Sequence, residues 1–149
     1  KNMSITNFPS TSRLWIYQSD RPFESTELDF INDKLNHFIG EWNNHGNNLT
    51  AGFEIKYNHF ILLVVDESQM SASGCSIDSS VRIIKEIGSE LNVDFFDRLK
   101  VAKFDEDVSI LKINDINTGI KNGSFTKETK VFNNLIDTLS QLDSEWIQN

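Results

Sequence analysis

The chain has 149 residues, of which 38% are hydrophobic, and 22 acidic against 14 basic side chains give it a formal net charge of −8. This is the size of one domain and the composition of a globular protein rather than a disordered one. Nucleic acid binding draws much of its affinity from Lys and Arg side chains that neutralise phosphates. Because the chain is acidic and its basic residues form no run, we expect no nucleic acid partner.

Three features bear on where the protein resides. Cys75 is the only cysteine, so the chain has no internal disulfide. The first residues show no apolar run after a basic start, which predicts no signal peptide. The longest apolar run, residues 60–65, is far shorter than the ~20 residues that span a bilayer. We therefore expect a cytoplasmic protein without a membrane segment.

The first elements are predicted from apolar spacing. Residues 14–18 favour a short strand, which Pro22 separates from the next element. A helix follows, capped by Ser25 or Thr26 and ended by the turn-forming residues 43–48. Its apolar side chains recur at the three-and-four spacing of one helix face: Leu28, Ile31, Leu35, Phe38, Ile39 and Trp42.

Two strands come next. Residues 49–57 alternate between apolar and polar, as in a half-buried strand, and Asn58 and His59 suit a tight hairpin turn. Residues 60–65 are apolar at every position. A strand of that kind is covered on both faces, so we expect it at the centre of the sheet.

The second half carries a loop at residues 69–74 and a helix over residues 76–91, with these side chains inward: Ile77, Val81, Ile84, Ile87 and Leu91. Residues 98–104 predict a strand, with which residues 108–113 can pair across the turn at 105–107. Residues 114–123 suit one short turn of helix. A C-terminal helix is expected from the spacing of Leu135, Leu139, Leu142 and Trp146, with a strand at 131–136 as the alternative.

The order strand, helix, strand, strand, helix, strand predicts an α+β ferredoxin-like sandwich, in which two helices cover one face of a four-stranded antiparallel sheet. Residues 12–113 would form this core, with the strands at Leu14 and Phe60 in the middle, and residues 114–149 an extension packed on it. Trp15 and Tyr17 share one strand face, which we expect on the open side of the sheet. The C-terminal helix, a second subunit or a partner protein would cover that side, and a homodimer is expected.

Five segments in this order resemble a family of short bacterial proteins of unknown function, often labelled "ABC transporter ATPase". They are RLWIYQSDR, FEIKYNHFILLVVDES, ASGCSID, VDFFDRL and VFNNL. The resemblance covers residues 12–146 and implies no known activity, so it assigns no functional residue.

The ATPase label conflicts with the sequence. An ATPase of this kind needs a glycine-rich loop that ends in Gly-Lys-Ser or Gly-Lys-Thr, because the loop amides and the lysine hold the phosphates. None of the seven glycines is followed by lysine. The sequence therefore predicts that the protein is not an ATPase.

The most site-like segment is residues 66–78, which lead from the apolar strand into the second helix. Its loop is small, and unpaired amides at a helix N-terminus suit an anion. We expect a small anionic ligand to be bound by Ser73, Gly74, Cys75, Ser76 and Asp78. The structural alternative is that the serines and Asp78 only cap the helix, while Cys75 packs as a small hydrophobe.

The function expected is a non-catalytic binding or interaction domain, which meets its ligand or partner through residues 66–78 or the open sheet face. The alternative is an enzyme, because a thiol at a helix N-terminus is activated as a nucleophile. Cys75 would then react with Asp66, Glu67 or Asp78 as acid or base, whereas His59 lies at the far end of its strand. Those three carboxylates could also hold a divalent cation. Adjacent acids are more often solvated, and the histidines show no zinc spacing, so no metal and no cofactor are expected.

Overall fold

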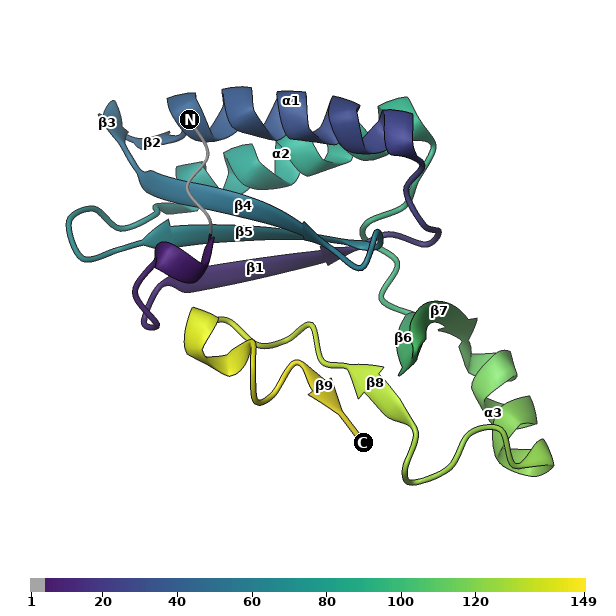
Figure 1. The fold of residues 1–149 in the computed structure, drawn as a ribbon. Helices are drawn as coiled ribbons and strands as arrows, with labels where there is room; N and C mark the ends of the chain where they lie inside the picture. The colour runs from purple at the N-terminus through teal and green to yellow at the C-terminus, as the bar shows by residue number, and fades with distance from the viewer. Residues whose placement is uncertain (1–4) are drawn as a thin grey trace.

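The computed structural model describes residues 5–149 and has an α+β fold of three layers (Figure 1). Helices α1 (Ser25–Glu41) and α2 (Gly74–Leu91) cover one face of a three-stranded antiparallel sheet, whose order is β1 (Arg13–Gln18), β5 (Phe60–Asp66) and β4 (Thr50–Lys56). A second sheet covers the other face, in the order β7 (Asp107–Lys112), β6 (Lys100–Asp105), β8 (Lys130–Phe132) and β9 (Ile147–Gln148).

The smaller elements join these layers. They are η1 (Ile5–Asn7), the hairpin of β2 (Asn43–Asn44) and β3 (Asn47–Asn48), α3 (Ile113–Asn122) and η2 (Leu139–Gln141). Within residues 5–149, no helix has the length and apolar character needed to span a membrane.

Strand β5 is the centre of the molecule, as its apolar run predicts. Residues 60–65 are all 0% exposed, and β5 pairs with β1 on one side and β4 on the other. Phe60, Leu62 and Val64 point toward the second sheet, whereas Ile61 and Leu63 point toward the helices. The strand is uniformly apolar because both of its faces lie in a core.

The predicted four-stranded sheet is wrong. The hairpin of β6 and β7 forms across residues 105–107 as expected, but β6 pairs with β7 and β8 rather than with β1. Strand β1 is therefore an edge strand, and its Leu14 amide donates to the carbonyl of Asp137. The physical reason is burial: the second sheet covers the apolar face of β5, which a fourth strand beside β1 would have left exposed to water.

Trp15 and Tyr17 lie on the opposite face from the one expected. They pack on the helix side, where Trp15 contacts Trp42, and burial raises the pKa of Tyr17 above 10.0. The other face of β1 presents Leu14 and Ile16 to the second sheet. Since the chain covers both faces itself, the open sheet face expected as a partner site does not exist.

Helix α1 and the following hairpin differ from the prediction in detail. The N-cap residue is Glu24, rather than Ser25 or Thr26, and its amide donates to Glu27 Oε1 at 2.8 Å. The hairpin turn has its positive φ angles at Tyr57 and Asn58 (both 54°), one residue before the predicted Asn58 and His59.

Helix α2 begins at Gly74 and buries serines in its first half. Ser76 and Ser80 are buried, while Ile77 and Val81 are only half-buried. Both serine hydroxyls find carbonyl acceptors, on Asn43 and Ile77 respectively. Because Ser76 and Ser80 are small and their hydroxyls are hydrogen-bonded, they can be buried where larger side chains would not fit.

The predicted C-terminal helix is also wrong. Residues 130–148 form β8, η2 and β9 instead, and α3 is a ten-residue helix rather than a single turn. Leu135 is 90% exposed and Trp146 is 2% exposed, although their spacing would place both on one helix face. Trp146 packs against Phe60 and Phe132, with ring centroids 5.0 Å from each, so the C-terminal segment is part of the core between the two sheets.

Two helical glycines offer a matched test of how closely α2 packs against the residues that follow it. A Cβ atom on Gly88 would lie 2.6 Å from the carbonyl oxygen of Val93, whereas one on Gly40 would meet nothing within 4 Å. We expect Gly40→Ala to raise the free energy of unfolding by about 0.5–1 kcal/mol, because alanine is the better helix former. Gly88→Ala should lower it by about 1–3 kcal/mol through overpacking. Urea denaturation measures both, and a stabilising Gly88→Ala would contradict the close approach of residues 88 and 93.

Candidate functional site

The segment expected as a site turns from the end of β5 into the start of α2, and two of its serines are engaged in holding α2 in place. Ser73 Oγ accepts from the Ser76 amide at 3.1 Å and caps the helix. Ser76 is 1% exposed and its hydroxyl donates to the carbonyl of Asn43 at 2.8 Å. The Trp42 indole donates to the Ser76 carbonyl at 2.8 Å. These contacts fasten the start of α2 to the end of α1.

The carboxylates of this segment serve the loop. Asp66 accepts from the Ser68 amide at 3.0 Å, and Glu67 accepts from the Ala72 amide at 2.9 Å. Asp78 is exposed on α2. Across the described residues, 5–149, no three His, Cys, Asp or Glu side chains lie close enough together to hold a metal ion.

Cys75 and Gly74 face outward. The Cys75 thiol is exposed, and a Cβ on Gly74 would meet no atom within 4 Å. Cys75 lies at one end of a groove of about 600 Å³ between α1 and α2. The groove is lined by Lys34, His37, Phe38, Glu41, Trp42, Asn43, His45, Cys75, Ser79, Ile83 and Glu86.

The groove exists because α1 and α2 run antiparallel on one face of the sheet (Figure 1). Each helix contributes residues at three-and-four spacing, which places them in one row along the groove. Phe38 and Ile83 supply apolar surface, and Phe38 packs against Trp42 with ring centroids 5.0 Å apart.

Two contacts along the groove join a basic side chain to a carboxylate. His37 Nε2 lies 3.3 Å from Glu41, and Lys34 Nζ lies 3.4 Å from Glu86. Both pairs are well exposed, so each contributes little to stability. Their arrangement leaves an apolar centre flanked by donors and acceptors.

The groove brings His37 and His45 together with Cys75, a grouping that the sequence analysis does not predict. The usable signal was topological: two antiparallel crossover helices bring the end of the first beside the start of the second. His59, by contrast, directly precedes β5, at the end of that strand remote from Cys75, and its Nδ1 lies 2.8 Å from the carbonyl oxygen of Tyr57.

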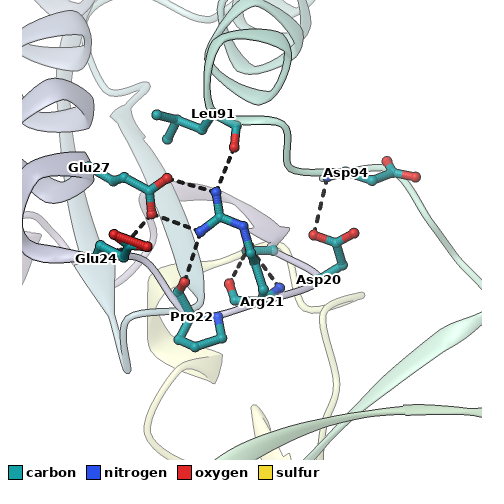
Figure 2. A network of polar contacts seen from close by, with 8 residues as sticks. Asp20, Arg21, Pro22, Glu24, Glu27, Leu91 and Asp94 are labelled. Carbon is teal, nitrogen blue, oxygen red and sulfur yellow. Dashed lines mark hydrogen bonds and ion pairs between the residues drawn. The ribbon is translucent and has the colours of Figure 1, made fainter.

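At the other end of the helix pair, Arg21 connects α1 to α2 (Figure 2). Its guanidinium donates to both carboxylate oxygens of Glu27 at 2.8 and 2.7 Å, and to the carbonyls of Leu91 at 2.6 Å and Pro22 at 3.1 Å. The hydrogen bonds from Arg21 are the larger cause that lowers the pKa of Glu27 to about 2, and the bond from the Glu24 amide is the second cause. The pKa of Arg21 is raised by the same carboxylate. This network, named the Arg21 clamp, joins the start of α1 to the end of α2.

No protein family, curated protein or solved structure matches this chain.

Proposed function

We propose that the protein is a non-catalytic binding domain and that the groove between α1 and α2 is its ligand site. The observation that carries this proposal is the size and lining of the groove. A volume of about 600 Å³ lies within the roughly 300–1,000 Å³ of small-molecule sites, which combine apolar surface with a few placed polar groups. Phe38 and Ile83 supply the first, and His37, His45 and Ser79 the second.

The ligand class follows from this lining. A small organic molecule would rest its apolar body on Phe38 and Ile83 and turn its polar groups toward the histidines. An anionic end, as expected from the sequence, would lie at the first turn of α2 beside Cys75, where the helix dipole favours negative charge. Glu41 and Glu86 oppose a second negative charge, because they line the same groove.

The proposal also covers the location of the protein, its family and its oligomeric state. We infer a cytoplasmic protein, since its single cysteine is free and exposed, and cytosolic proteins seldom rely on disulfides. Membership of the family of short bacterial proteins and a homodimeric state are proposed with it.

The groove can be tested by filling it. We expect a fragment screen against ¹⁵N-labelled protein to move the amide signals of residues on both groove walls. Ser79→Trp should abolish those shifts, because residue 79 lines the groove. Arg82→Trp is the matched control, since Arg82 is exposed on the same helix outside the groove. Fragment binding that survives Ser79→Trp, or no binding by the wild type, would overturn the proposal.

One observation favours a second candidate function, an enzyme with Cys75 as nucleophile. The thiol is exposed and shares the groove with His37, His45 and Glu41, any of which could act as its base. The measurement is the rate of Cys75 alkylation by iodoacetamide at pH 7, in folded and urea-unfolded protein. A folded rate far above the unfolded rate supports the enzyme, and His37→Gln or His45→Gln should then lower it. Equal or slower reaction in the folded protein rules that function out.

A further inference from the structure

Strand β4 forms a border of the central sheet, and among residues 5–149 its outer side has no strand partner. It is the outermost strand in the order β1-β5-β4 (Figure 1). Among the backbone hydrogen bonds that residues 5–149 make with one another, none reaches the outer side of residues 50–56. An edge of seven residues offers donors and acceptors to another strand, and monomeric proteins usually shield such edges.

The alternation of the sheet identifies the groups that face outward. The Leu14 amide donates to Asp137, away from β5. The backbone N–H and C=O groups of the even residues of β1 therefore point away from β5. The odd residues of β1 exchange hydrogen bonds with the odd residues of β5 that lie opposite them. The even residues of β5 consequently exchange backbone hydrogen bonds with the even residues of β4 that lie opposite them. The backbone groups left on the outer side of β4 belong to Ala51, Phe53 and Ile55.

From this edge we propose that a second copy of the chain pairs with β4 about a two-fold axis, forming one continuous six-stranded sheet. The register that pairs all seven residues places Phe53 opposite its own copy. Ala51 then lies opposite Ile55, Gly52 opposite Glu54 and Thr50 opposite Lys56. Phe53 and its copy would exchange backbone hydrogen bonds at the axis, as isologous symmetry requires.

Side chains favour this register and this partner. No like charges face each other directly, and each Glu54 is already paired with Lys56 of its own chain at 3.1 Å. Moving the axis to residue 54 would set Glu54 against Glu54, which is destabilising. A hollow of about 310 Å³ also runs beside the edge, lined in part by Leu28, Phe53 and Ile55. The copy's Ala51 and Phe53 side chains would lie on this side of the sheet.

The test is a register-specific disulfide in the full chain, with Cys75→Ser as background. Thr50 and Lys56 would form a non-hydrogen-bonded pair between copies, with Cα atoms about 4.5 Å apart, within disulfide reach. We expect Thr50→Cys/Lys56→Cys to give a covalent dimer on oxidation. Within one chain the two positions are six residues apart on a single strand and cannot join. Each single variant is a control, because its cysteine would lie far from the copy's.

Sedimentation equilibrium supplies an independent measurement. The wild type is expected at about twice 17.1 kDa, and Ile55→Pro should return it to the monomer mass, because residue 55 faces outward and proline lacks the amide donor. Circular dichroism checks that each variant is folded. A monomeric wild type, or a dimer in which the double variant forms no disulfide, would overturn the proposal. The pairing of β4 does not rest on the groove, so ligand binding in the groove and dimerisation through β4 can fail separately.

Discussion

Replacing Trp146 with alanine is expected to lower the free energy of unfolding by about 3–5 kcal/mol, the usual cost of truncating a large buried aromatic residue. Trp146 is 2% exposed. Its ring packs on Phe60 and Phe132, and its indole donates to Asn134 Oδ1 at 2.9 Å. The variant would leave a cavity between the two sheets and an unsatisfied side chain beside it. Guanidinium denaturation followed by far-UV circular dichroism measures the effect.

Leu135→Ala is the matched control. Leu135 is 90% exposed, so its truncation should change the free energy of unfolding by less than about 0.5 kcal/mol. If both residues lay on one face of a C-terminal helix, both variants would destabilise the protein strongly. Comparable losses from the two variants would therefore contradict the β8, η2 and β9 arrangement.

Glu27→Gln is expected to lower the free energy of unfolding at pH 7 by about 1.5–3 kcal/mol, the range for hydrogen bonds to a charged group. Glu27 accepts two of the hydrogen bonds that the Arg21 guanidinium donates, and one from the Glu24 amide. Its neutral replacement keeps the shape of the side chain but loses its charge. Because Arg21 also binds the carbonyl of Leu91, the variant should loosen the contact between α1 and α2.

The pH dependence of this loss has a definite sign. The pKa of Glu27 is lowered from 4.5 to about 2 in the folded protein. A group with a lowered folded pKa stabilises the native state above its unfolded pKa and loses that effect as pH falls through the folded value. The difference between wild type and Glu27→Gln should be complete above about pH 5 and shrink as pH falls toward 2.

Glu86→Gln provides the comparison on the same helix pair. Glu86 meets Lys34 at 3.4 Å with 54% of its side chain exposed, so its loss should cost less than about 0.5 kcal/mol and show no such pH dependence. Denaturation at several pH values between 7 and 2 measures both variants. A Glu27→Gln loss that persists unchanged at pH 2 would contradict the Arg21 clamp.

The candidate site was only partly predictable. Cys75 at the start of a helix follows from the sequence, and the structure places it there. That His37 and His45 line the same groove does not follow from the sequence, because contacts between α1 and α2 depend on how the two helices lie on the sheet. Ser73 and Ser76, two of the residues expected to bind a ligand, cap and fasten α2. The bond from Ser76 to Asn43 is a contact that no local pattern encodes.

The sequence by itself determined the elements whose apolar period is long and regular. Helices α1 and α2, the hairpin of β4 and β5 and the central place of β5 all follow from periodicity, because burial of a repeating apolar face is a local property of the chain. Only the tertiary structure decided where β6 pairs and how residues 130–148 fold. Strand pairing is a competition between distant partners, and here burial of β5 beneath a second sheet outweighs extension of the first. The helical spacing of Leu135 and Trp146 is overridden for the same reason: Trp146 gains more from the core around Phe60 than a short surface helix would provide.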